Sequence, residues 1–137
     1  MRKVTNKHFG LEDRIYHSST DVIIGDWDYF SKFFKDRGIK QDRPNKNWLA
    51  ETGVIYNDDD TLKGYYIRIP VIDFTNLNYC SIIHELSHLT FLVLDHCDVK
   101  FGIDNQEPYS YLLEMFLNDF LLKAMKLYKQ PTKGRVR

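Results

Sequence analysis

The chain has 137 residues, of which 43% are hydrophobic and 28% charged, and this composition excludes a disordered protein. Folding at this length buries roughly two thirds of the surface of the unfolded chain, so we expect a single domain over residues 1–137. Nineteen Lys and Arg residues balance nineteen Asp and Glu residues, which argues against a dedicated nucleic-acid-binding protein.

The cysteine content and the hydropathy of the chain indicate the cellular compartment in which we expect the protein. Cys80 and Cys97 are too few for a disulfide framework, and we expect free thiols in a reducing environment. Residues 1–10 lack the apolar stretch of a secretory signal, which favours a cytoplasmic location. The longest apolar region, residues 82–94, is interrupted by polar side chains and is shorter than the ~18 residues of a membrane span, so we expect no membrane-spanning segment.

The first fifty residues are expected to be a helical region. Asp26 or Asp28 can cap a short helix that ends before Gly38, a residue suited to the position just past a helix end. The apolar positions at helical spacing are Phe30, Phe33 and Phe34. Residues 42–47 have the composition of a loop.

Residues 51–129 are expected to form the core of the domain, and this region opens with a β-hairpin. Residues 54–56 and 65–71 are rich in β-branched and aromatic side chains, and polar residues separate them. The aspartates at 58–60 fit the hairpin turn better than a calcium loop, which would need a later glutamate. Because Pro70 cannot donate a ladder hydrogen bond, the second run is predicted to be an edge strand.

Two helices are expected to follow the hairpin. Apolar residues keep a helical period from residue 77 to about Asp98, after the possible N-caps Thr75, Asn76 and Asn78. Gly102 marks a turn, and a last helix is predicted over residues 106–129. The remaining residues, 130–137, are expected to be a loose basic tail, and its lysines fit a solvated face better than a phosphate-binding one.

Residues 84–88 spell the motif HExxH inside the first of these helices. Residues four apart lie on one helix face, so His84 and His88 can bind one metal ion, for which zinc is the natural choice. Glu85 lies beside them, where it can accept a proton from a metal-bound water. The competing interpretation is a helix with two incidental histidines.

A catalytic zinc site needs a third protein ligand, and Glu107 is the candidate. An antiparallel return of the last helix would bring its carboxylate back towards the two histidines. The alternative is a first-turn carboxylate favoured by the helix dipole. The form of the motif with a third histidine is excluded, because position 94 is a leucine. Four further residues are weaker candidates for ligands or for hydrogen-bond acceptors of a ligand, and each fits a helix-end or turn position better: Asp95, His96, Asp98 and Asp104.

Tyr111 lies one helical turn beyond Glu107, on the face that also carries Ser110 and Glu114. Its phenol can stabilise a developing oxyanion, so Tyr111 is a catalytic candidate, with a place in the core as the alternative. Cys80 precedes His84 by one turn and is expected to be a small buried helix residue rather than a ligand.

The pattern of His84, Glu85, His88 and a later Glu107 resembles the gluzincin type of zincin metallopeptidase. Residues 53–121 also resemble small zincin-like proteins of phage and prophage genomes. The resemblance implies an α+β fold with a minimal zincin-like core, in which a small, mostly antiparallel sheet packs on the HExxH helix and a C-terminal helix. It implies that the two histidines and Glu107 bind Zn²⁺, that Glu85 is general base and acid, and that the strand around residues 65–71 holds an extended substrate.

We therefore expect a zinc-dependent hydrolase, a metallopeptidase that acts on a peptide or protein substrate. The alternative is a non-catalytic, metal-stabilised interaction or virion-associated module of phage origin. The larger gluzincins carry an oxyanion residue further along the chain, and only about sixteen residues follow the apolar helix core here.

Overall fold

The computed structural model describes residues 3–39, 50–74 and 78–129. The fold is α+β, as predicted, with a four-stranded sheet, a two-stranded sheet and three helices in this part of the chain. The predicted loop at 42–47, the tail at 130–137 and the possible caps Thr75 and Asn76 lie outside the described residues.

The larger sheet has the strand order β2-β3-β5-β4. β2 (Lys7–Glu12) pairs antiparallel with β3 (Ser19–Ile24), β3 pairs parallel with β5 (Leu62–Ile69), and β5 pairs antiparallel with β4 (Glu51–Tyr56). The smaller sheet joins β1 (Lys3–Val4) to β6 (Ile72–Asp73), also antiparallel.

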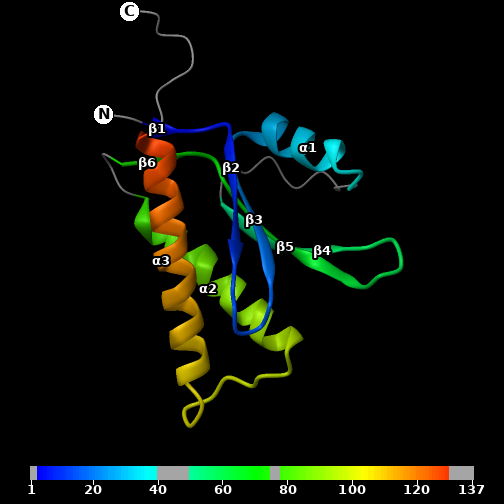
Figure 1. Cartoon of the computed structure of the whole chain (residues 1–137), viewed down its shortest axis with the longest axis vertical. Helices are drawn as coiled ribbons and strands as arrows, with labels where there is room; N and C mark the ends of the chain where they lie inside the picture. The colour runs from blue at the N-terminus through cyan, green and yellow to red at the C-terminus, as the bar shows by residue number, and fades with distance from the viewer. Residues whose placement is uncertain (1–2, 40–49, 75–77, 130–137) are drawn as a thin grey trace, which may run out of the picture.

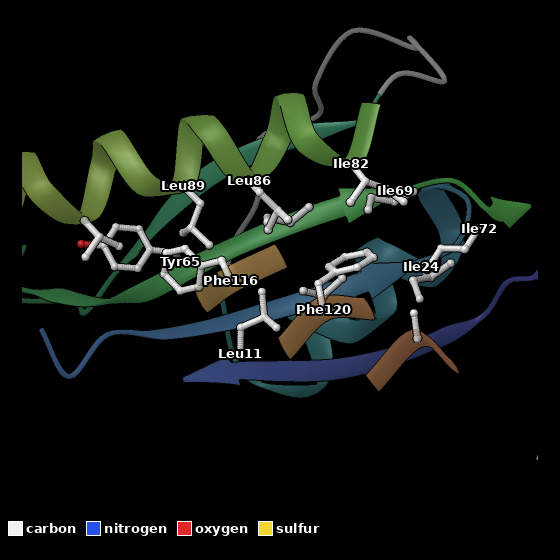
Figure 2. Close-up of a cluster of buried hydrophobic side chains, with 14 of the residues drawn as sticks. Leu11, Ile24, Tyr65, Ile69, Ile72, Ile82, Leu86, Leu89, Phe116 and Phe120 are labelled. Carbon is white, nitrogen blue, oxygen red and sulfur yellow. The ribbon is translucent and has the colours of Figure 1, made fainter. Parts of the chain in front are cut away.

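Helices cover both faces of the four-stranded sheet (Figure 1). α1 (Trp27–Asp36) packs on one face, and α2 (Tyr79–His96) and α3 (Glu107–Lys129) pack on the other. Successive residues of a strand point to opposite faces, so β3 sends Ile23 to the α1 side and Val22 and Ile24 to the other. The larger core, on the α2 and α3 side, is drawn in Figure 2.

The predicted helices are confirmed. Asp26 caps α1 by accepting a hydrogen bond from the backbone N–H of Tyr29 at 2.9 Å. Gly38 follows the helix with a φ of +70°, the left-handed conformation that glycine adopts without strain. Asn78 is the N-cap residue of α2, but its side chain bonds to Val71 and Asp73 instead of the helix.

The N-terminal region is not purely helical, since β1, β2 and β3 precede α1. The β2–β3 connection is built on Asp13, which is buried although it is charged. Its carboxylate accepts hydrogen bonds from the backbone N–H groups of Ile15, Tyr16 and Ser18. This side chain orders the turn without the glycine or asparagine that usually marks a hairpin in a sequence.

The predicted hairpin is confirmed as β4 and β5, but the prediction that its second strand is an edge strand is wrong. β5 has a partner on each side, β3 and β4. Pro70 falls one residue after the last residue of β5, Ile69, so its missing N–H costs the ladder nothing. The edge of the sheet beside α2 is β4, from which Thr52 reaches the helix. No helix among the described residues is long and apolar enough to cross a membrane.

Candidate metal centre

His84 and His88 lie together on the exposed side of α2. Their Nε2 atoms are 3.0 Å apart, and the two rings meet edge to face with centroids 4.6 Å apart. Two imidazole nitrogens bound to one tetrahedral zinc at 2.0–2.1 Å would be about 3.3 Å apart. The helix thus directs both nitrogens to one point, at nearly the spacing that a shared metal ion requires.

Glu85 occupies a different side of α2. Its side chain is buried, with 6% of its surface exposed, and its Oε2 accepts a hydrogen bond from Thr52 Oγ1 on β4 at 2.5 Å. The same hydroxyl lies 3.1 Å from the backbone oxygen of Glu85. Glu85 is therefore held between the helix and the edge of the sheet, one residue from His84.

The charge of Glu85 acts on a second carboxylate, Glu51, which pairs with a buried cation. Arg68, which is buried, forms an ion pair with Glu51, with Nε 3.5 Å from Oε1. Burial raises the pKa of Glu51 above its usual value, the Arg68 charge partly offsets this, and the charge of Glu85 adds a smaller increase. Burial also raises the pKa of Tyr66 to about 12, with a further contribution from Glu51. Glu85 is therefore weakly coupled to the Glu51–Arg68 ion pair at the start of β4, whose arginine lies over Phe30 on the α1 side of the sheet.

The third predicted ligand, Glu107, is not brought to the histidines. Within residues 3–39, 50–74 and 78–129, no group of three or more His, Cys, Asp or Glu residues is arranged to hold a metal ion. Tyr109 explains the position of Glu107: its ring packs on Phe91 of α2, with centroids 4.7 Å apart. Glu107 precedes Tyr109 by two residues, about 200° around the helix, so it lies on the side of α3 away from α2. Glu107 as a ligand stays a prediction.

Tyr111 follows Tyr109 by two residues and lies on the same far side of α3. It is 61% exposed, so the alternative of a core position is wrong. It lines a cleft with Ile15 and Met115. Tyr111 thus faces away from α2, which carries Glu85, and its catalytic role stays a prediction.

The other candidates have simpler roles. His96 is exposed in the last turn of α2, as predicted, and its Nδ1 lies 2.8 Å from the backbone oxygen of Leu92 and 3.1 Å from the Tyr65 hydroxyl. Cys80 and Cys97 are free, as expected, but Cys80 is exposed, so the prediction that it is buried is wrong. Asp59 accepts hydrogen bonds from Thr61, which lower its pKa and complete the predicted hairpin turn.

A group of exposed aromatic side chains one helix turn beyond His88 was not predicted. Phe91, three residues after His88, packs on Phe101 and Tyr109, and both phenylalanines are about half exposed. The adjoining cleft has a volume of about 560 Å³, and its lining includes Asp95 and Asp98. The signal in the sequence is Phe91 itself, an apolar residue one turn beyond His88 on the polar side of the helix.

Comparison with known proteins adds no family assignment: no family profile, no curated protein and no solved structure matches this chain.

We predict that Thr52→Val destabilises the fold by about 1–3 kcal/mol, because a nearly buried carboxylate then loses its hydrogen-bond donor. Chemical denaturation measures the change in the free energy of unfolding. Thr61→Val is the matched control, since Thr61 makes its hydrogen bond to Asp59 in an exposed turn and its loss costs little. Equal losses in both variants would show that the Thr52 bond contributes nothing special.

A second prediction concerns the coupling between carboxylates. In Glu85→Gln the pKa of Glu51 falls towards its usual value, because the neighbouring negative charge that raises it is removed. An NMR titration that follows the side-chain carboxyl carbon of Glu51 measures this. Glu114→Gln, an exposed change on α3, is expected to leave the Glu51 titration where it is. An unchanged or higher Glu51 pKa in Glu85→Gln would contradict the coupling.

Proposed function

We propose that this protein is a zinc-dependent hydrolase, most specifically a metallopeptidase. The observation that carries the proposal is the pair of imidazole nitrogens, 3.0 Å apart, next to a carboxylate anchored at the edge of a sheet. The donor set suits zinc, which binds neutral imidazole and tolerates the ligand geometry that a single helix turn imposes. Glu107 is the proposed third ligand, and binding would require the first turn of α3 to turn towards α2.

Bound zinc would supply a Lewis acid and lower the pKa of a coordinated water to about 7. Glu85 is the proposed general base: Thr52 engages its Oε2, which leaves Oε1 to take a proton from the attacking water. The same carboxyl then returns the proton to the leaving amine. The hydrogen bond from Thr52 would keep the Glu85 carboxylate from rotating, so the same oxygen, Oε1, would accept the proton and return it.

The surroundings of the pair suit a peptide substrate. Among the described residues β4 pairs with β5 alone, so its outer edge can pair with an extended peptide beside Glu85. The cleft at Phe91 and Phe101 offers an apolar surface for a side chain of that peptide. The resemblance implies instead that β5 holds the substrate. However, β5 is paired with β3 along one edge and with β4 along the other, so neither edge is open to a peptide.

A second candidate is a non-catalytic, metal-stabilised interaction module. The observation that favours it is the site itself, which assembles two protein ligands among the described residues where a catalytic zinc has three. The exposed aromatic cluster beside the pair would then serve as a contact surface rather than a substrate cleft.

The first test is metal content. Protein purified without added zinc is expected to carry about one zinc per chain by elemental analysis, and His84→Ala and His88→Ala are each expected to lose it, because each removes a donor. Glu107→Ala is expected to weaken zinc binding tenfold or more, and Glu114→Ala serves as its control. Equal binding by Glu107→Ala and Glu114→Ala would remove Glu107 from the ligand set, and zinc-free wild-type protein that binds none on titration would end the proposal.

The second test separates the two candidates. Glu85→Gln is expected to keep its zinc but to lower kcat/KM for a fluorescently labelled, unfolded protein substrate by about 10²–10⁴, since it removes the proton acceptor. Glu114→Gln is expected to keep full activity. A zinc-loaded wild type that cleaves no such substrate would favour the interaction module, as would equal cleavage by wild type and Glu85→Gln.

A further inference from the structure

The outer side of α3 carries a stripe of exposed apolar side chains. Tyr111, Leu122 and Met125 are 61%, 57% and 40% exposed, and Met115 is partly exposed between them. Ile15, in the β2–β3 connection, is 54% exposed and lines a cleft next to this stripe. Large apolar side chains that gather on one face of a soluble domain usually mark a contact surface.

The spacing of the stripe is that of a helix-pairing seam. Its members, in order, are Tyr111, Met115, Asn118, Leu122 and Met125. The steps between them are four, three, four and three residues, and they fall within about 80° of the helix circumference. The buried residues of α3, which include Phe116 and Phe120, lie on the opposite side. One face of α3 therefore builds the core (Figure 2), and the other has the pattern of a second packing face.

The charges on α3 favour a second copy of this helix as the partner, packed in the antiparallel direction. The first half of the helix exposes the acidic residues Glu107 and Glu114, and the last turns expose the basic residues Lys126 and Lys129. Two copies of α3 packed antiparallel place the acidic half of each against the basic half of the other. A parallel pair would place like charges together.

The polar member of the seam fits the same arrangement. Asn118 lies at the middle of the stripe, so a two-fold axis through an antiparallel pair brings the two Asn118 amides close to each other. An amide can donate and accept, so the pair can satisfy itself, whereas against an apolar partner it would be left without a hydrogen bond. A single buried asparagine of this kind fixes the register of paired helices.

We propose that the partner of this face is a second copy of the chain, with the two α3 helices packed antiparallel about Asn118. The seam spans two heptads, and the expected dimer is therefore weak, with a dissociation constant on the order of 10 µM. The interface is isologous, so it closes as a dimer and does not extend into a fibre.

The test is the oligomeric state of the full chain by sedimentation equilibrium over a wide range of concentration. The wild type is expected to pass from monomer to dimer, and Leu122→Asp is expected to raise the dissociation constant at least tenfold, because it places a charge among the apolar side chains of the seam. Ile103→Asp is the matched control: Ile103 is 89% exposed in the α2–α3 connection and lies outside the stripe. A wild type that stays monomeric up to about 1 mM would overturn the proposal, as would a dimer that Leu122→Asp leaves unchanged.

Charge reversal tests the direction of the two helices. Glu114→Lys is expected to weaken the dimer, and the double variant Glu114→Lys with Lys126→Glu is expected to restore it, because the two halves again carry opposite charges. Circular dichroism confirms that each variant is folded. A double variant that dimerises no better than Glu114→Lys alone would overturn the antiparallel pairing.

Discussion

The rotation of α2 about its own axis determines where every part of the candidate site lies. Ile82, Leu86, Leu89 and Val93 are almost completely buried and fall within a narrow arc of the helix. Each buried apolar side chain contributes about 1.5–3 kcal/mol, so the set resists even a one-residue turn of 100°, which would carry these side chains out of the core. With this arc against the sheet, Glu85 must face β4 and the two histidines must face solvent. The packing of α2 on the sheet thus determines where Glu85 and the two histidines lie, and the Thr52 hydrogen bond only fixes the orientation of the Glu85 carboxylate.

Local patterns were enough to predict the helices and the β4–β5 hairpin, because caps, periodicity and turn residues act over a few positions. The place of β5 in the sheet was not predictable in this way. β5 gains its second neighbour, β3, from a segment about forty residues earlier, and Pro70 suggested an edge only because the end of the strand was unknown. β2 and β3 were not predicted, because Asp13 rather than a glycine organises the turn between them.

The candidate site likewise has parts that follow from local sequence and parts that depend on long-range packing. The convergence of His84 and His88 depends on one helix turn, and the sequence predicts it well. The position of Glu107 depends on how α3 is rotated, which a spacing of nineteen residues does not specify. That rotation follows from long-range packing: Leu112, Phe116 and Phe120 enter the core and Tyr109 packs on Phe91. Thr52 and Arg68 were not predictable from local sequence, because packing of α2 on β4 brings Thr52 to Glu85 and pairing of β4 with β5 brings Arg68 to Glu51.

The two faces of α3 link the proposed zinc site to the proposed dimer. The rotation that buries Phe116 and exposes Leu122 also turns Glu107 outward, so a partner helix packed on the seam would hold Glu107 where it now lies. Glu107 can reach the histidines only if the first turn of α3 rewinds or separates from such a partner. In the proposed arrangements both events use the Glu107 carboxylate, so zinc binding through Glu107 and pairing of the acidic and basic halves of α3 would oppose each other. Linkage requires the effect to be mutual: zinc would weaken the dimer, and dimerisation would weaken the affinity for zinc.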